Sequence, residues 1–241
     1  MAVPALLLDL ICQAAREQQG GAACSAGYPD LLVTAQDLER LMGPDKVSRV
    51  PTRPDSAQII AWHSAGGWLD RVFDAASVFG ELGYTLDVLD VQAARGGEII
   101  VDLNRPLAAD FGRSYDLVLD TGTCEHCFHI GQAAMNLASL VKERGMIIQA
   151  LPLNSYNHGF YNVNPTWIHD FYPANGFEIL YFKGVSTVVT RPKLFEPPPF
   201  ARFEQAPDNA IMVVVARRNR VAPLQAPTQR KYQANPKLGN K

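Results

Sequence analysis

The spacing of hydrophobic positions changes near residue 57. Before that point, apolar residues recur at helical intervals in two short segments, and glycines follow each of them. Thr34 is a natural N-cap for the second segment, and Gly43 stands after its end. We therefore predict a helical appendage over residues 1–54. The apolar face of its first helix comprises Leu6, Leu7, Leu10 and Ile11.

From residue 57 to 182, short apolar runs alternate with segments of helical spacing. Alternation of this kind is typical of a mostly parallel sheet with helices on both faces. We predict an α/β domain over residues 55–216. Its strands are expected at 58–62, 85–90, 98–102, 115–120, 146–151, 177–182 and 211–216. Residues 217–241 hold seven Lys or Arg and no acid, which predicts a flexible basic tail.

Composition narrows the functional classes. Hydrophobic residues make up 47% of the 241 residues and the formal net charge is −2, which excludes a wholly disordered chain and disfavours nucleic-acid binding. No apolar run approaches the ~20 residues of a membrane span, so we expect no membrane partner. Four cysteines do not form a disulfide scaffold, which favours a reducing cytoplasm. The oligomeric state stays open, with a homodimer as one alternative.

Acidic residues end three successive predicted strands, at Asp90, Asp102 and Asp120. Ligands of open parallel sheets bind at the carboxyl ends of the strands, and a carboxylate there can accept both hydrogen bonds of a ribose diol. The alternative is that each acid caps the turn that follows it. Recurrence at three strand ends favours a ligand.

Several stretches together resemble the class I S-adenosylmethionine-dependent methyltransferases over residues 57–182. They are the strand end at Asp90 and residues 102–106, 115–120, 122–126, 158–161 and 164–165. The resemblance implies a Rossmann-like doubly wound sheet with 211–216 as an extra final strand. It also implies a cytoplasmic enzyme that transfers a methyl group from S-adenosylmethionine to a small-molecule acceptor in biosynthesis. Cofactor contacts would then come from Asp90, Asp102, Asp120 and Gly122.

The glycine-rich turn of that family is only partly present. A Gly-x-Gly-x-Gly turn usually follows the first strand, because backbone without side chains can approach the cofactor closely. Here the corresponding position holds Gly66 and Gly67. Gly67 lies twenty-three residues before Asp90. Either the cofactor binds in a modified way, or the fold has become a non-catalytic scaffold that no longer binds it.

The densest group of reactive side chains follows the strand that ends at Asp120. His126 is a candidate general base, since an imidazole titrates near neutral pH. Glu125 could orient that imidazole or bind the acceptor, and His158 could reach the same pocket from the loop after the next strand. Tyr161 is a candidate for the pocket wall. The alternative for Glu125 and His126 is a structural network at the start of the following helix.

A metal site is the competing interpretation of the same segment. Cys124 and Cys127 have Cys-x-x-Cys spacing, with His126 and His129 interleaved, but the second cysteine pair of a structural zinc site is missing. Three histidines, or a set that uses Glu125, would suit a catalytic metal and a metal-dependent enzyme. The leading interpretation, methyl transfer, assigns no metal. The third histidine of such a set would be His158.

Overall fold

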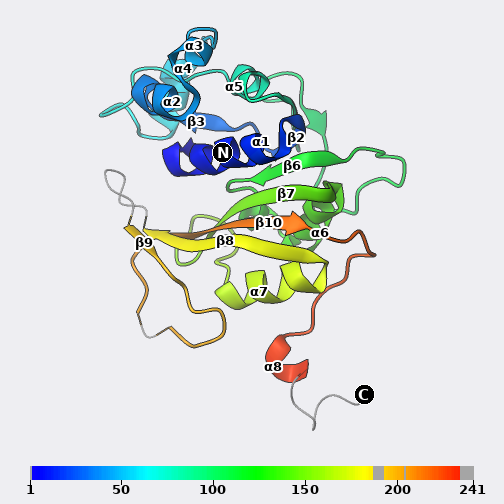
Figure 1. The fold of residues 1–241 in the computed structure, drawn as a ribbon. Coiled ribbons are helices and arrows are strands. Elements are labelled where there is room, and N and C mark those ends of the chain that lie inside the picture. Colours follow the sequence, from blue (N-terminus) through cyan, green and yellow to red (C-terminus); the bar gives the residue numbers. More distant parts are fainter. Residues whose placement is uncertain (1, 187–192, 204, 234–241) are drawn as a thin grey trace.

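The computed structural model describes residues 2–186, 193–203 and 205–233. Its centre is a sheet of eight strands in the order β5-β4-β2-β6-β7-β10-β8-β9 (Figure 1). The strands are β2 (Gly21–Ala26), β4 (Tyr84–Asp90), β5 (Ile99–Ile100), β6 (Tyr115–Asp120), β7 (Val141–Pro152), β8 (Phe177–Ser186), β9 (Lys193–Phe195) and β10 (Ala210–Arg218).

The strand order confirms the predicted doubly wound sheet. Strands β5, β4, β2, β6 and β7 are parallel, and their order along the sheet reverses between β2 and β6. If these five strands are numbered 1 to 5 in chain order, their order across the sheet is 3-2-1-4-5, which is the arrangement of doubly wound folds. Strand β10, the extra final strand that the resemblance implied, pairs antiparallel with β7 and with β8.

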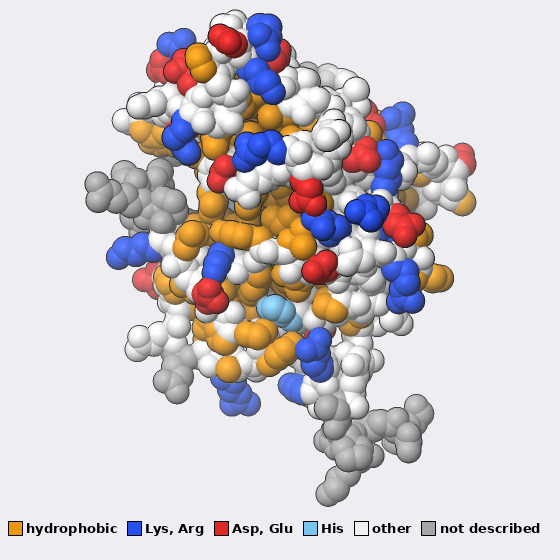
Figure 2. Space-filling view, in the orientation of Figure 1, with side chains coloured by type: hydrophobic (Ala, Val, Ile, Leu, Met, Phe, Trp, Pro, Cys, Tyr) orange, Lys and Arg blue, Asp and Glu red, His pale blue; other side chains and the backbone are white. Residues whose placement is uncertain are grey.

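Successive side chains of a strand point to opposite faces of the sheet, and here both faces are apolar. Helices therefore cover both faces and form two cores with them. On β6, Leu117 and Leu119 belong to the core beneath α1 (Ala5–Gln18) and α5 (Ala75–Glu81). Val118 between them belongs to the core beneath α6 (Ile130–Leu140) and α7 (Pro165–Ala174). On the face drawn in Figure 2, hydrophobic side chains gather across the middle, and acidic and basic side chains are intermixed around them.

A small helical layer stands beyond β2, at the top of Figure 1. It contains β1 (Ala2–Pro4) paired with β3 (Asp30–Leu32), then α2 (Ala35–Met42), α3 (Pro44–Val47) and α4 (Ser56–Trp62). Thr34 caps α2 as predicted: its hydroxyl accepts from the Asp37 amide at 3.1 Å, and Gly43 follows the helix. Among the described residues, no helix has the length and apolar character needed to cross a bilayer.

The first strand of the domain was predicted in the wrong place. Residues 58–62 form α4, and the central position belongs to β2, whose sequence is GAACSA. Small residues have little strand preference, but here β4 and β6 flank the strand and both of its faces are covered. Gly66 and Gly67 therefore follow a helix and not a strand end.

The predicted boundaries also change. The segment expected as an appendage, 1–54, contributes the central strand β2, so that part of the prediction was wrong. The expected tail begins inside β10, where Arg218 is buried and donates to the Val141 carbonyl at 2.7 Å. The chain then returns along α7: the Gln225 amide donates to Asn175 Oδ1 at 2.8 Å. Beyond α8 (Arg230–Gln233), the expected tail lies outside the described residues.

Candidate functional site at the carboxyl edge of the sheet

The reversal of strand order defines where a ligand of this fold is expected, outside the carboxyl ends of β2 and β6. Gly27 follows β2 with a φ of 77°, and Gly122 follows β6 with a φ of 115°. The two turns are joined because the Thr123 hydroxyl donates to the Ala26 carbonyl at 2.7 Å. Both turns thus carry a glycine, whose lack of a side chain favours close approach of a ligand to the backbone.

Asp90 stands at this edge with hydrogen-bonding capacity to spare. It ends β4, one strand from β2, and its side chain is half-buried. Oδ1 accepts from the Gln92 amide at 3.3 Å. Within the described part of the chain, Oδ2 has no hydrogen-bond partner, so this oxygen remains available to a ligand.

Asp102 and Asp120 behave differently from Asp90. Asp102 is exposed, and two hydrogen bonds from Asn104 (3.0 and 2.9 Å) hold the pKa of its carboxyl below the ordinary value. Asp120 is fully buried and accepts from the Thr123 amide at 2.9 Å and from Gln149 Nε2 at 2.7 Å. Asp102 caps its own turn, as Asp90 does through the Gln92 amide, and Asp120 holds the turn after β6. All three therefore make the hydrogen bonds of the turn-capping alternative, and Asp90 differs in its Oδ2, which is unpartnered in the described structure.

The turn after β2 carries an aromatic and ionic network in place of further glycines. The Tyr28 ring lies beneath the guanidinium groups of Arg53 and Arg95, at 4.6 and 5.3 Å from its centroid. Its hydroxyl donates to Asp74 Oδ2 at 2.9 Å, and Arg95 pairs with Asp30 at 3.0 Å. Sequence reasoning missed these residues because it placed the first strand elsewhere; Gly27 after a run of small residues was the available signal.

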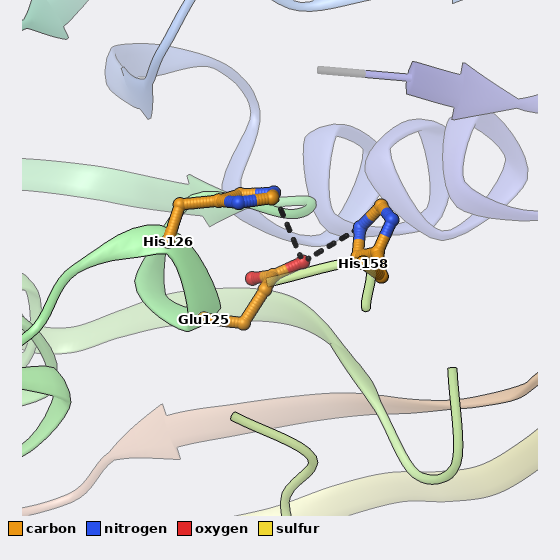
Figure 3. A group of neighbouring side chains, drawn as sticks. All are labelled: Glu125, His126 and His158. Carbon is orange, nitrogen blue, oxygen red and sulfur yellow. Dashed lines mark ion pairs between the residues drawn. The ribbon is translucent and has the colours of Figure 1, made fainter. Parts of the chain in front are cut away.

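Glu125, His126 and His158 form a second group at the same edge (Figure 3). Glu125 and His126 belong to a short 3-10 helix, η1 (Cys124–His126), after β6, and His158 comes from the loop after β7. Glu125 Oε1 lies 3.4 Å from His158 Nε2 and 4.0 Å from His126 Nε2. The two imidazole rings are half-exposed, whereas the Glu125 side chain is only 2% exposed. The structure thus brings together three residues that the sequence analysis selected.

Two glycines leave room for this arrangement. A Cβ on Gly159 would lie 2.8 Å from the Glu125 carbonyl oxygen, and one on Gly122 would lie 3.3 Å from Glu125 Oε1. The Phe160 amide donates to the Glu125 carbonyl at 2.8 Å, which fastens the loop to η1. His158 is placed beside Glu125 by this close backbone contact.

The Glu125 carboxyl is electrostatically unusual. Burial, reinforced by the negative charge of Asp120, raises its pKa to about 8. Its Oε2 is buried without a hydrogen-bond partner among the described residues. Burial and the neighbouring His158 lower the pKa of His126. An isolated buried carboxylate is costly, so this site favours either a neutral carboxyl or a bound cation.

The other candidates lie around this group. His129 is outside it: its amide donates to Asn104 Oδ1 at 2.9 Å, and its ring packs on Phe128. Cys124 and Cys127 are buried free thiols, and burial raises the pKa of Cys127 to about 11, so neither is poised as a thiolate ligand. Tyr161 donates to the Phe128 carbonyl at 2.7 Å and lines a cavity of about 570 Å³ beside α7.

No protein-family model matches this sequence, and no curated protein matches it. Among solved structures, TehB from Haemophilus influenzae matches with 11% identity and a TM-score of 0.42, over 58% of this chain and 52% of TehB. This chain thus spans about half the length of TehB. The N-methyltransferase NodS from Bradyrhizobium japonicum WM9, solved with S-adenosyl-L-homocysteine, matches with 9% identity and a TM-score of 0.40, over 88% of this chain and 86% of NodS.

A Thermotoga maritima protein described as a possible histamine N-methyltransferase matches with 14% identity and a TM-score of 0.33, over 60% of this chain and 68% of its own. The fold is the doubly wound α/β sheet with an extra final strand that the resemblance implied. This assignment follows from the strand order and from the antiparallel β10 between β7 and β8.

Proposed function

We propose that this protein transfers a methyl group from S-adenosylmethionine to a small-molecule acceptor. The observation that carries the proposal is the half-buried carboxylate of Asp90, with one oxygen free of partners in the described structure, beside the reversal of strand order. A ribose presents two neighbouring hydroxyls, and a carboxylate at the second parallel strand is suited to accept from both.

The surrounding residues fit a nucleoside-bearing cofactor. Gly27 and Gly122 have positive φ angles on either side of the reversal point and present backbone without side chains. We assign Asp102, just beyond the next strand end, to the adenine side of the cofactor. When bound, the cofactor supplies an electrophilic methyl group.

Glu125, His126 and His158 lie after β6 and β7, across the reversal point from Asp90. We assign them to the acceptor, whose hydroxyl or amine they would bind and help to deprotonate. Tyr161 and the cavity beside α7 would contribute to the acceptor side. Alignment of the acceptor atom with the methyl carbon for in-line displacement would supply much of the rate.

Calorimetric titration of the full chain with S-adenosylmethionine and S-adenosylhomocysteine tests this proposal. We expect saturable binding to the native chain and an affinity about tenfold weaker in Asp90→Asn, which removes the charge and one acceptor. The matched control is Asp110→Asn at an exposed loop position, which should bind as the native chain does. The proposal fails if millimolar ligand produces no binding or if Asp90→Asn binds equally well.

A further inference from the structure

We propose that Glu125, His126 and His158 bind one divalent first-row transition-metal ion. The carboxylate oxygen and the two imidazole nitrogens that face each other all lie within 4.8 Å of one another. Ligand atoms around a tetrahedral zinc ion are about 3.4 Å apart, since each lies about 2.1 Å from the metal. The Glu125–His158 pair already has this separation, at 3.4 Å. The Glu125–His126 pair is wider, at 4.0 Å, and the half-exposed His126 ring has room on its solvent side.

A second observation, independent of these distances, points to a cation. The Glu125 side chain is 2% exposed, and its Oε2 has no hydrogen-bond partner among the described residues. The carboxylate is directed between the two imidazoles, toward the place an ion would occupy (Figure 3). Oε1 is the oxygen that faces the two imidazoles, and a buried carboxylate whose other oxygen is unpartnered is stabilised when a metal ion binds it.

The donor set indicates the class of metal. Two imidazoles and one carboxylate bind zinc in catalytic sites and iron(II) in other enzymes, in both cases with coordination positions left open. The side chains of His126 and His158 are 48% and 53% exposed, so solvent or a substrate can reach an ion held between them. Cys127 is directed elsewhere, with its Sγ 3.7 Å from the Thr123 carbonyl.

A metal ion held by these three residues would also activate the methyl acceptor. An acceptor hydroxyl bound at an open position would lose its proton more readily, because the ion stabilises the anion that forms. This consequence rests on the proposed methyl transfer, whereas metal binding itself does not.

The test uses the full chain without an affinity tag, stripped with a chelator and titrated with Zn²⁺ by calorimetry and with Co²⁺ by visible absorption. We expect one equivalent of each ion to bind. His126→Ala and His158→Ala should each weaken binding by at least about tenfold. Glu125→Gln, which keeps the shape of the side chain, should do the same. The matched control, His129→Ala, removes an imidazole three residues from His126 and should bind as the native chain does.

Circular dichroism and thermal unfolding of each variant separate a lost ligand from a lost fold. The inference is overturned if the stripped native chain binds neither ion, or if the folded His126→Ala/His158→Ala double variant binds as tightly as the native chain. Titrating the same stripped chain with S-adenosylhomocysteine separates the two proposals. Metal binding without nucleoside binding supports this site and removes the methyl-transfer proposal, and the converse result removes the metal site alone.

Discussion

Gly159 shows how one residue controls the distance between two segments far apart in the sequence. An alanine Cβ at this position would lie 2.8 Å from the Glu125 carbonyl oxygen and 3.0 Å from its Cγ. The first distance, to a backbone atom, is closer than Cβ contacts allow, and the second is tighter than most Cβ contacts. The loop that carries His158 can therefore approach η1 only with glycine at position 159.

Gly159→Ala should push this loop away from η1. We expect Zn²⁺ binding weaker by about tenfold or more and a loss of about 1–3 kcal/mol in the free energy of unfolding, as in other overpacked sites. Calorimetry and urea unfolding measure the two effects. Gly67→Ala is the matched control, because its Cβ would meet nothing within 4 Å. Equal Zn²⁺ affinity in both variants would contradict this account of the loop.

The three strand-end aspartates show which properties of single residues the sequence could predict. Three aspartates were expected at strand ends, and all three lie at or just beyond the ends of β4, β5 and β6. Asp90 Oδ2 has no partner in the described structure, whereas Asp102 Oδ2 lies 3.4 Å from Arg105 Nε and both oxygens of Asp120 accept hydrogen bonds. Asp120 is engaged by Gln149, from a strand whose pairing with β6 the sequence pattern could not specify.

At the scale of elements, a buried chain of hydrogen bonds joins β6, β7 and α7. The Tyr172 hydroxyl donates to Gln149 Oε1 at 2.9 Å, and Gln149 Nε2 donates to Asp120 Oδ2 at 2.7 Å. Asp120 in turn accepts from the Thr123 amide, which holds the turn leading to η1. This network positions the element that carries Glu125 and His126.

Tyr172→Phe should lower the free energy of unfolding by about 1–3 kcal/mol, because the buried Gln149 oxygen loses its donor. Urea denaturation followed by circular dichroism measures the change. Tyr156→Phe alters a side chain that is 83% exposed and should leave stability within about 0.5 kcal/mol of the native value. Matching stabilities for the two variants would show that the network contributes little.

At the scale of the whole molecule, the first 54 residues are not separable from the rest. They contain β2, which lies between β4 and β6, and α1, whose buried side chains form part of one core. A chain that begins at residue 55 should show no cooperative unfolding transition, since the parallel sheet would lack its central strand. Thermal unfolding followed by circular dichroism checks this. A truncated chain with a transition like that of the full chain would restore the appendage interpretation.

The sequence by itself determined those helices and strands whose own residues have clear hydrophobic spacing or capping residues. The capped helix α2 and the apolar strands β4, β6, β7 and β10 form where hydrophobic spacing and terminal residues predicted them. Tertiary structure alone decided that GAACSA is a strand and that residues 58–62 are a helix. The physical reason is that short segments of weak or mixed preference take the conformation that their neighbours in space stabilise. The same holds for the carboxyl edge, where pairing between distant strands determines which side chains meet.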